Sequence, residues 1–252
     1  MLRRLLERAT RKSTFRRRLP AAAGGGPIIV SGSAGLKYLL RSMDEVDPAL
    51  VRLAREFVRP GHVVWDIGAN IGLFAFAAAH LAGVKGKVFA FEPDVWLVQL
   101  LRRSAALQSP GSASVDIIPA AVARACQLRT FHIAARSSAT NSLAGYGHAQ
   151  TGGVAETQTV LTVTLDWLAA ETAPPDVLKI DVEGAELEVL RGGLELLRGR
   201  NPVLLCEVGA DSSPEISALL HDLGYRLYDG ECADAQRPEV DRAPWNTIAL
   251  RR

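Results

Sequence analysis

Residues 63–72 read VVWDIGANIG, and this stretch decides the fold. An apolar run of strand type ends at Asp66, the chain then passes through two glycines spaced four apart, Gly68 and Gly72, and a helix-like run follows over residues 73–81. A strand that turns through glycines into a helix is the junction at which α/β proteins bind nucleotide-type cofactors. We therefore expect a doubly wound α/β sheet with a cofactor held at this turn.

The glycine pattern indicates which cofactor this turn holds. A dinucleotide site has the pattern G-x-G-x-x-G, so that a pyrophosphate sits on the helix N-terminus, whereas here the pattern is D-x-G-x-N-x-G. A buried Asp66 repels phosphate but suits an ammonium group and a sulfonium, and S-adenosylmethionine carries both. We expect Asn70 or the loop N–H groups to meet its carboxylate, and Gly68 and Gly72 to let it approach the backbone.

A second acidic residue follows twenty positions after the last glycine. Residues 87–91, KVFAF, predict the next strand, and Glu92 stands at its carboxyl end, where an acid accepts hydrogen bonds from both ribose hydroxyls. Pro93 ends the strand. The two motifs together predict S-adenosylmethionine more specifically than either alone. The alternative is that Glu92 merely caps the helix that begins at Asp94.

With these motifs, the chain resembles a known family, the FkbM-family methyltransferases. Five separate motifs agree with that family in order and at similar spacings. They are DIGANIG at 66–72, FEP at 91–93, TLDWL at 164–168, LKIDVEGAELEVLRG at 178–192 and the strand at 202–207. The resemblance covers roughly residues 44–250.

The resemblance implies a class I methyltransferase fold, which is Rossmann-like and doubly wound. Its sheet is mostly parallel and seven-stranded, with an antiparallel C-terminal hairpin that we assign to residues 225–228 and 245–250. The resemblance also places Ala121 beside the adenine ring as a backbone contact. The activity it implies is O-methylation of a hydroxyl on a sugar, glycoconjugate or secondary metabolite.

Composition predicts one domain in a reducing compartment. The chain has 252 residues and is 48% hydrophobic, which is enough for one substantial core, and we assign the methyltransferase domain to residues 27–252, in the cytoplasm. The three cysteines, Cys126, Cys206 and Cys232, form no C-x-x-C motif and leave one unpaired in any scheme, which argues against a disulfide framework and a zinc site. The longest apolar run, residues 71–84, is shorter than the roughly 18 to 20 residues that span a bilayer, so we expect a core helix.

Charge is concentrated at the N-terminus. Residues 1–18 hold eight of the 29 Lys and Arg and one of the 27 Asp and Glu, a net +7 that leaves −5 on the other 234 residues. An acidic body argues against nucleic acid as a partner. We expect residues 1–26 to be a basic, flexible tail and linker, although apolar residues at helical spacing within 2–9 also allow a short amphipathic helix that contacts an acidic surface. Pro20 and the glycines after it interrupt the apolar segment that an export signal requires.

Several elements outside these motifs are also predicted. Asp47 and Pro48 are expected to cap and start a helix that runs to about Val58. Residues 127–134 and 157–164 alternate or are β-branched, which predicts two extra strands.

Between these two strands, residues 137–153 form a long polar and glycine-rich segment. Such a segment either lines a substrate site or is an ordinary surface loop. His148 within it is a secondary candidate for a base. Farther along, Asp166 is expected to cap the helix at 167–171.

The candidate catalytic residues follow the strand predicted at 177–180. Methyl transfer is an in-line displacement, so the enzyme holds an acceptor roughly 3 to 3.5 Å from the methyl carbon and helps remove its proton. Asp181, Glu183 and Glu207 come to the same edge of a parallel sheet, and such a group of carboxylates raises the pKa of one member toward the useful range. We predict Asp181 and Glu183 as acceptor-positioning or basic groups. Lys179 lies on the same strand face as Asp181 and is either its partner or a base with a lowered pKa.

Several rival functions compete with this one. Three carboxylates at one edge also suit a divalent cation, but no histidine adjoins them, and we predict no metal. An NAD-type oxidoreductase disagrees with the glycine pattern and with Asp66. The sequence also allows a non-catalytic cofactor-binding module and an N- or RNA methyltransferase. It predicts neither the acceptor nor the oligomeric state.

Overall fold

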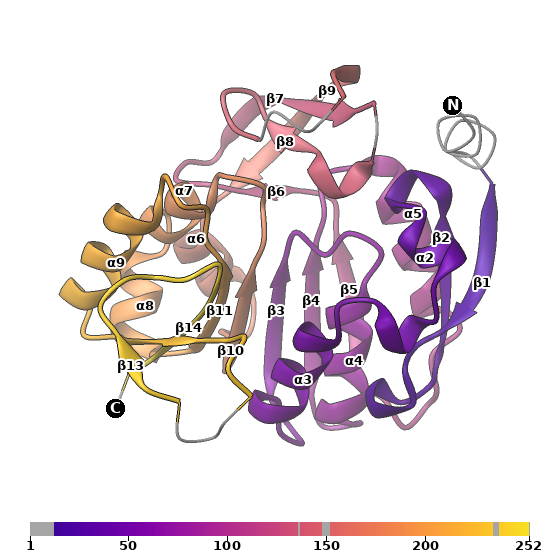
Figure 1. Cartoon of the computed structure of the whole chain (residues 1–252), viewed down its shortest axis with the longest axis horizontal. Coiled ribbons are helices and arrows are strands. Elements are labelled where there is room, and N and C mark those ends of the chain that lie inside the picture. The colour runs from indigo at the N-terminus through magenta and orange to yellow at the C-terminus, as the bar shows by residue number, and fades with distance from the viewer. Residues whose placement is uncertain (1–12, 136, 148–151, 234–236, 252) are drawn as a thin grey trace.

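The structure is built around one large mixed sheet. The computed structural model describes residues 13–135, 137–147, 152–233 and 237–251. Within these residues, eight strands form the sheet in the order β13-β12-β14-β11-β10-β3-β4-β5 (Figure 1). In chain order they are β3 (Val63–Ile67), β4 (Lys87–Phe91), β5 (Ser114–Ile118), β10 (Val177–Ile180), β11 (Val203–Glu207), β12 (Arg226–Asp229), β13 (Glu239–Val240) and β14 (Asn246–Leu250).

The strand order confirms the predicted doubly wound arrangement. Strands β11, β10, β3, β4 and β5 pair in parallel, and β10 lies directly beside β3. This is the 3-2-1-4-5 order of a Rossmann-type sheet, whose switch point lies between β3 and β10. The predicted C-terminal hairpin is also present, because β14 pairs antiparallel with both β11 and β12. The predicted count of seven strands is wrong by one, since the two-residue β13 adds an eighth by pairing with β12.

Helices cover both faces of this sheet. They are α2 (Lys37–Leu40), α3 (Pro48–Phe57), α4 (Leu73–Ala82), α5 (Val95–Ala105), α6 (Leu165–Glu171), α7 (Glu186–Arg191), α8 (Leu194–Arg200) and α9 (Ser213–Asp222), with short 3-10 turns at Ala21–Ala23, Gly32–Ala34, Met43–Glu45 and Ser138–Thr140. Helices α3, α4 and α5 pack on one face against residues such as Val64 and Val177. Helices α6 to α9 pack on the other face against residues such as Trp65 and Leu178. Successive strand residues thus enter opposite cores, as the period of two requires.

Helix α4 is the core helix predicted from the apolar run. Eight of its ten residues are buried, because it lies between the sheet and α3. None of the helices in the described part of the chain is both long and apolar enough to cross a membrane.

A second, four-stranded sheet lies over the carboxyl ends of the central strands, as Figure 1 shows. Its order is β6-β9-β7-β8, with β6 (Ala121–Val122), β7 (Gln127–Ala134), β8 (Ser142–Leu143) and β9 (Val154–Val163). Strands β7 and β9 are the two extra strands predicted from alternation. Their buried side chains, including Phe131, Ile133 and Val160, form a small core of their own.

The N-terminal region contributes a strand that the sequence did not predict. Strand β1 (Thr14–Arg18) pairs antiparallel with β2 (Pro27–Ser31), and Leu19 and Ala23 in the predicted linker are buried in the main core. The predicted amphipathic helix at residues 2–9 lies outside the described residues. The division into a tail at 1–26 and a domain at 27–252 stays a prediction.

Two predicted helix caps are wrong in detail. Helix α3 starts at Pro48 as expected, but Asp47 has φ +47° and makes no side-chain capping bond, because its carboxylate pairs with the Lys37 ammonium group at 2.7 Å. Helix α6 is capped by Thr164, whose hydroxyl accepts the Trp167 N–H. Asp166 caps α8 instead, by accepting the N–H groups of residues 195 and 196.

Candidate active site

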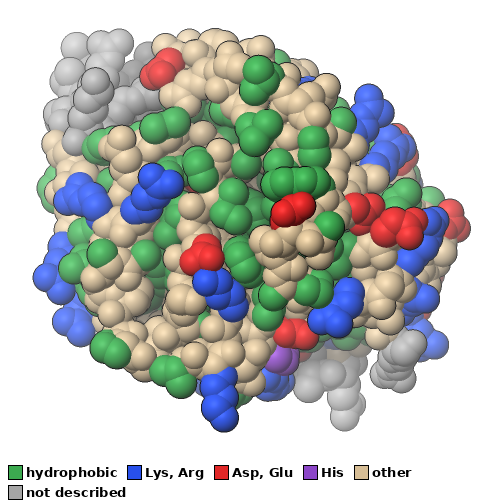
Figure 2. All heavy atoms as spheres, turned by 180° about the vertical axis from the view of Figure 1, so that it is seen from behind, with side chains coloured by type: hydrophobic (Ala, Val, Ile, Leu, Met, Phe, Trp, Pro, Cys, Tyr) green, Lys and Arg blue, Asp and Glu red, His purple; other side chains and the backbone are tan. Residues whose placement is uncertain are grey.

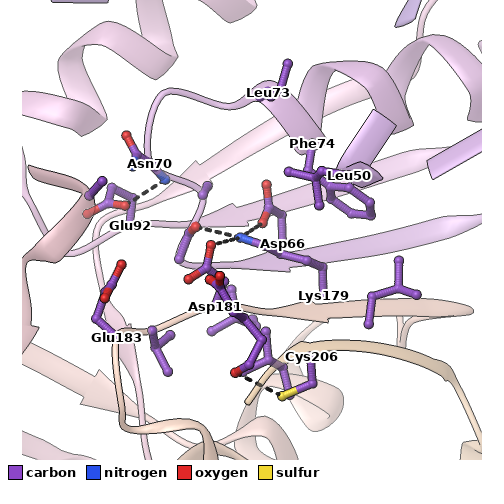
Figure 3. A pocket seen from close by; sticks show the side chains of 18 of the residues that line it. Leu50, Asp66, Asn70, Leu73, Phe74, Glu92, Lys179, Asp181, Glu183 and Cys206 are labelled. Carbon is purple, nitrogen blue, oxygen red and sulfur yellow. Dashed lines mark hydrogen bonds and ion pairs between the residues drawn. The ribbon is translucent and has the colours of Figure 1, made fainter. Parts of the chain in front are cut away.

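A cavity of about 540 Å³ lies between the carboxyl ends of the central strands and the second sheet. This volume is within the range of about 300 to 1,000 Å³ that is typical of ligand sites. The cavity is lined by eight of the nine residues predicted from sequence, namely Asp66, Gly68, Asn70, Glu92, Ala121, Lys179, Asp181 and Glu183. Residues from several separate strands and loops thus meet here, as Figure 3 shows for part of the set.

The ninth predicted residue, Gly72, does not line the cavity. Its φ is +90°, and a Cβ at this position would lie 2.5 Å from the Phe76 ring and 2.7 Å from Leu101. Gly68 does line the cavity, but a Cβ there would collide with the carbonyl oxygen of Asp181. Both glycines are therefore required by close protein packing and by positive φ. The expectation that they also let a cofactor approach the backbone stays a prediction.

Lys179 links three strand-end groups in the floor of the cavity. Its Nζ lies 3.1 Å from Asp66 Oδ1 and 3.3 Å from Asp181 Oδ2, and it donates a hydrogen bond of 2.9 Å to the Gly68 carbonyl oxygen (Figure 3). The pairing follows from the register, because Lys179 is directly opposite Asp66 in the parallel pair of β10 and β3. Lys179 and Asp66 are nearly inaccessible, with 7% and 1% of their side chains exposed.

The two acids around Lys179 decide its protonation state. Burial alone would lower the pKa of Lys179, but the charges of Asp66 and Asp181 outweigh burial and hold the pKa above its usual value. Lys179 is therefore a fixed cation, and the alternative that desolvation makes it a base is wrong. Burial also raises the pKa of Asp66, although Lys179 opposes this.

Asp181 and Glu207 form an asymmetric acid pair. Burial alone would raise the pKa of Asp181, but the charge of Lys179 and a hydrogen bond from Glu207 hold it below its usual value. Burial, the charge of Asp181 and that shared hydrogen bond raise the pKa of Glu207 to about 9. At neutral pH Glu207 is thus protonated and donates to an ionised Asp181, which is the usual outcome when two carboxyl groups share one site.

Glu183 is held in a strained position at the cavity wall. Its φ is +55°, a left-handed conformation that costs about 1 to 3 kcal/mol in a residue other than glycine. The turn is fixed by Glu186, whose Oε1 accepts the N–H groups of Val182 at 3.3 Å and Gly184 at 2.9 Å. Burial and the charges of Asp181 and Glu186 raise the pKa of Glu183 to about 8.

Strain is concentrated around this cavity. Four residues other than glycine have positive φ in the described chain, namely Asp47, Asn70, Glu183 and Asn201. The first three line the cavity, and the fourth ends helix α8. Such strain persists only where the surrounding structure imposes it, and it is typical of functional sites.

Glu92 follows β4, which lies on the other side of β3 from β10 and β11, and the Asn70 backbone is bonded to it. Glu92 accepts the Asn70 N–H on Oε2 at 2.8 Å and the Asp94 N–H on Oε1 at 2.9 Å, and it is 5% exposed. Burial raises its pKa to about 8. Glu92 is not the cap of α5, because the Asp94 carboxylate accepts the Trp96 N–H there, and each Glu92 oxygen retains a lone pair for a ligand. The buried Oδ1 of Asn70 meets no hydrogen-bond donor in the described chain.

The second sheet supplies a wall that sequence reasoning only partly anticipated. Asn141 donates from Nδ2 to Asp94 Oδ2 at 2.9 Å and accepts the Ala134 N–H at 2.8 Å, so it fastens the segment after β7 to the start of α5. Ser138, Ala139 and Asn141 line the cavity. Of the two interpretations of residues 137–153, these positions favour a substrate-lining segment. His148 lies outside the described residues.

Two more wall segments come from the ends of the chain. Lys37 and Tyr38 line the cavity from the N-terminal side, and Trp245 and Asn246 line it from the start of β14. Trp245 and Asn246 could have been identified as cavity residues from the antiparallel pairing of β14 with β11. This pairing brings the beginning of β14 to the end of β11. The described residues contain no group of three or more His, Cys, Asp and Glu side chains arranged to hold a metal ion.

Comparison with known proteins agrees with this geometry. Residues 66–227 match the family model of the methyltransferase FkbM domain. This chain belongs to the FkbM methyltransferase family. It is an S-adenosylmethionine-dependent methyltransferase, and its sheet order is that of the class I methyltransferase fold predicted from sequence.

This FkbM methyltransferase also has individual relatives. It is 29% identical over 204 residues to the hexuronic acid methyltransferase AglP of Haloferax volcanii, covering 77% of this chain and 78% of that protein. The solved methyltransferase FkbM from Methylobacillus flagellatus KT is 15% identical, with a TM-score of 0.48 over 80% of this chain and 52% of that one. The magnesium protoporphyrin IX methyltransferase of Synechocystis PCC 6803, solved with bound S-adenosylmethionine, is 13% identical, with a TM-score of 0.47 over 82% and 78% of the two chains.

The glycine at the centre of the FkbM motif allows a direct test of packing. Gly68→Ala should destabilise the protein more than Gly61→Ala, which has a similar φ of +87° but nothing within 4 Å of its Cβ position. Both variants carry backbone strain of about 1 kcal/mol or more, and the collision with Asp181 adds about 1 to 3 kcal/mol in Gly68→Ala alone. Urea unfolding measures the difference. Equal losses in the two variants would contradict this reason for Gly68.

Proposed function

We propose that this FkbM methyltransferase O-methylates a hydroxyl of a sugar. The observation that carries the proposal is that the Asp181–Glu207 acid pair and Glu183 face the same cavity as Glu92, at the carboxyl edge of the sheet. One end of the cavity then suits the cofactor and the other suits a hydroxyl acceptor. AglP, the relative named above, acts on hexuronic acids and supports a sugar-type acceptor. The three cysteines, all free, fit the reducing cytoplasm.

The residues at the Glu92 end fit S-adenosylmethionine, which supplies the methyl group when bound. Glu92 has free lone pairs for the ribose hydroxyls, and its oxygens are oriented by two backbone N–H groups. From the sequence we expected Asp66 to meet the ammonium group and Asn70 the carboxylate. Because Asp66 is paired with Lys179, we assign the ammonium group instead to the buried Asn70 Oδ1, which has no donor in the described chain. Ala121 in β6 leaves space for the adenine in the wall. Asp66 contributes indirectly, because its carboxylate holds Lys179 in place.

The acceptor end provides the groups that orient a hydroxyl and remove its proton. We assign the base to Glu183, since a carboxylate with a pKa of about 8 is a stronger proton acceptor near neutral pH than Asp181, whose pKa is lowered. Asp181, ionised and fixed by Lys179 and Glu207, accepts a hydrogen bond from the acceptor and positions it. The acceptor oxygen would gain the methyl group as the bond between that carbon and the sulfonium breaks, which leaves S-adenosylhomocysteine, and the acceptor's hydroxyl proton would move to a carboxylate oxygen of Glu183.

Methyl transfer to a panel of acceptors tests this proposal. The purified protein is incubated with S-adenosylmethionine carrying a labelled methyl group and with neutral sugars, uronic acids, lysine peptides and RNA, and products are analysed by mass spectrometry. We expect labelled methyl ethers of one or more sugars. Label that enters only peptide amines or RNA would overturn sugar O-methylation.

The RNA substrate in this experiment tests the alternative that the enzyme methylates RNA. The distribution of charged side chains on the protein surface does not favour this alternative. On the face shown in Figure 2, Lys and Arg side chains lie apart, with uncharged and acidic side chains between them. A protein that binds a nucleic-acid backbone usually presents a continuous basic face.

Glu92→Ala tests the cofactor end of the site. The variant loses the two ligand-facing oxygens, so we expect its dissociation constant for S-adenosylhomocysteine to rise roughly 5- to 150-fold, which corresponds to about 1 to 3 kcal/mol. Isothermal titration calorimetry measures this. Asp116→Ala is the control, because Asp116 lies in the neighbouring strand but pairs with Lys87 at the surface. Wild-type affinity in Glu92→Ala would remove Glu92 from the cofactor site.

A further inference from the structure

Three residues beside β14 line the cavity but are not required for methyl transfer itself, namely Glu231, Trp245 and Asn246. We propose that Trp245, with Glu231 and Asn246, forms a second sugar subsite, in which an uncharged pyranose ring of the acceptor glycan stacks on the indole and its hydroxyls bind Glu231 and Asn246. This inference rests on the proposed sugar methylation and extends it, because the acceptor is then an oligosaccharide or glycoconjugate and more than one sugar unit is recognised.

The register of the sheet places this subsite next to the acid pair. Asn246 is directly opposite Glu207 in the antiparallel pair of β14 and β11. Side chains at opposed positions lie on the same face, with Cβ atoms about 4.5 to 5.5 Å apart. The Trp245 carbonyl oxygen accepts the Val208 N–H at 2.7 Å, so the pairing of β14 with β11 continues for one residue beyond the ends of the two strands. Trp245 immediately precedes Asn246 and lines the same cavity as Asp181 and Glu207, so we expect a sugar held at Trp245 to be the neighbour of one held at the acid pair.

Trp245 differs from the other aromatic residues of the cavity in its exposure. It lines the cavity and is 51% exposed. The other aromatic side chains that the described chain contributes to the lining are all buried, namely Tyr38, Phe74, Phe91 and Phe131. An aromatic ring at a cavity mouth offers a large apolar surface at a small loss of conformational entropy, and the C–H face of a pyranose is an apolar surface of similar size.

Two described residues near the subsite, Gly230 and Arg237, are bonded to neighbouring elements. The Gly230 N–H donates to the Asn246 carbonyl oxygen at 2.6 Å, and Arg52 of α3 donates from Nη2 to the Gly230 carbonyl oxygen at 2.5 Å. Arg237 adds a bidentate ion pair to Glu56 of α3, with both hydrogen bonds at 2.8 Å. These bonds fix Gly230 and Arg237 before a ligand binds, which favours affinity.

The polar groups at this mouth suit hydroxyls more than an anion. Asn246 donates from Nδ2 to Glu231 Oε1, so the exposed Glu231 carboxylate is oriented and still has lone pairs for hydroxyl donors. The two cations among the described lining residues are already paired, Lys37 with Asp47 at 2.7 Å and Lys179 within the floor. A sugar carboxylate at this subsite would meet Glu231 without a compensating charge, whereas a neutral ring meets no such repulsion.

Binding of disaccharides to the protein loaded with S-adenosylhomocysteine tests the subsite. Saturation-transfer NMR is used with neutral disaccharides of glucose, galactose and mannose, and with their uronic acid counterparts. The variants are Trp245→Ala, Trp245→Phe and the control Trp167→Ala. Trp167 is 46% exposed on α6 and does not line the cavity.

We expect at least one neutral disaccharide to bind the wild type and the control equally, and to bind Trp245→Ala about tenfold more weakly, with part of the affinity restored in Trp245→Phe. Affinity for S-adenosylhomocysteine should be unchanged in all three variants. The subsite is refuted if no neutral disaccharide binds the wild type, if Trp245→Ala binds as the control does, or if only uronic acid disaccharides bind. Failure of the proposed function is seen separately, as absence of methyl transfer to sugars in the labelled assay.

Discussion

Lys179→Met should lower the free energy of unfolding by about 3 to 5 kcal/mol, because it leaves two acids at the cavity floor without their shared cation. The methionine side chain fills a similar volume, so the loss reports charge and not a cavity. Asp66 is fully buried and Asp181 half-buried, and both lie within 3.3 Å of the ammonium group that is removed. Chemical denaturation followed by tryptophan fluorescence measures the change.

The loss should depend on pH in a defined direction. Without Lys179, the pKa values of Asp66 and Asp181 in the folded state rise well above the value of about 4 that they have in the unfolded chain. The unfolded state then releases protons that the folded state keeps, so the stability of Lys179→Met falls further as pH rises above about 4. At pH below this value, the difference from wild type should be smallest.

Two further variants separate this explanation from a general packing defect. Asp66→Asn in the Lys179→Met background removes one of the two uncompensated charges and should recover part of the lost stability. Lys87→Met removes the cation of a surface pair with Asp116 in the adjacent strand and should change stability by about 1 kcal/mol or less. An additive double variant, or equal losses in the two lysine variants, would refute a buried charge cluster organised by Lys179.

Glu183→Gln should reduce kcat by about 10²- to 10⁴-fold, the usual contribution of a general base. Glutamine has nearly the same shape and keeps the left-handed backbone position, but its amide does not accept the proton of the acceptor hydroxyl. Affinity for S-adenosylhomocysteine should remain close to wild type, because the cofactor end of the cavity is unchanged. Steady-state kinetics with the sugar methylated in the labelled assay measures the effect. Glu195→Gln, at an exposed acid of α8, is the control.

The same variant should alter the pH profile. The pKa of Glu183 is raised to about 8, and its ionised form is the one that accepts a proton. In the wild type, kcat/KM should therefore rise with pH from about 6 and level off above about 8. Glu183→Gln should lose this rise. If Glu183→Gln keeps both rate and profile while Asp181→Asn is inactive, the base is Asp181 and Glu183 has a structural role.

Much of the cavity was predicted from sequence because its residues follow directly after strands. Asp66, Glu92 and Asp181 each stand at or next to the end of an apolar run, and the carboxyl ends of parallel strands meet at one edge. Order along the chain was enough to bring them together. Ala121 was expected only from the family resemblance, and the cavity includes it.

The errors arise where a residue's role depends on its spatial neighbours. Gly72 and Gly68 look alike in the motif, but one packs against Phe76 and Leu101 while the other faces the Asp181 backbone. Asp166 lies in the first turn of the helix it was expected to cap, yet its carboxylate bonds to the N-terminus of α8, some thirty residues later. Trp245 showed no pattern of its own in the sequence.

Hydrophobic patterns and motif order along the chain were sufficient for the fold class, the family and the edge of the sheet at which the polar residues gather, because all three depend on local sequence. How the charges at that edge are shared follows from the tertiary structure alone. Lys179 is a fixed cation and Glu207 a proton donor to Asp181 because side chains on β3, on β10, just after β10 and at the end of β11 meet at a mostly buried site. Electrostatic interactions in a buried site depend on distance and desolvation, and neither is encoded in the spacing of residues along the chain.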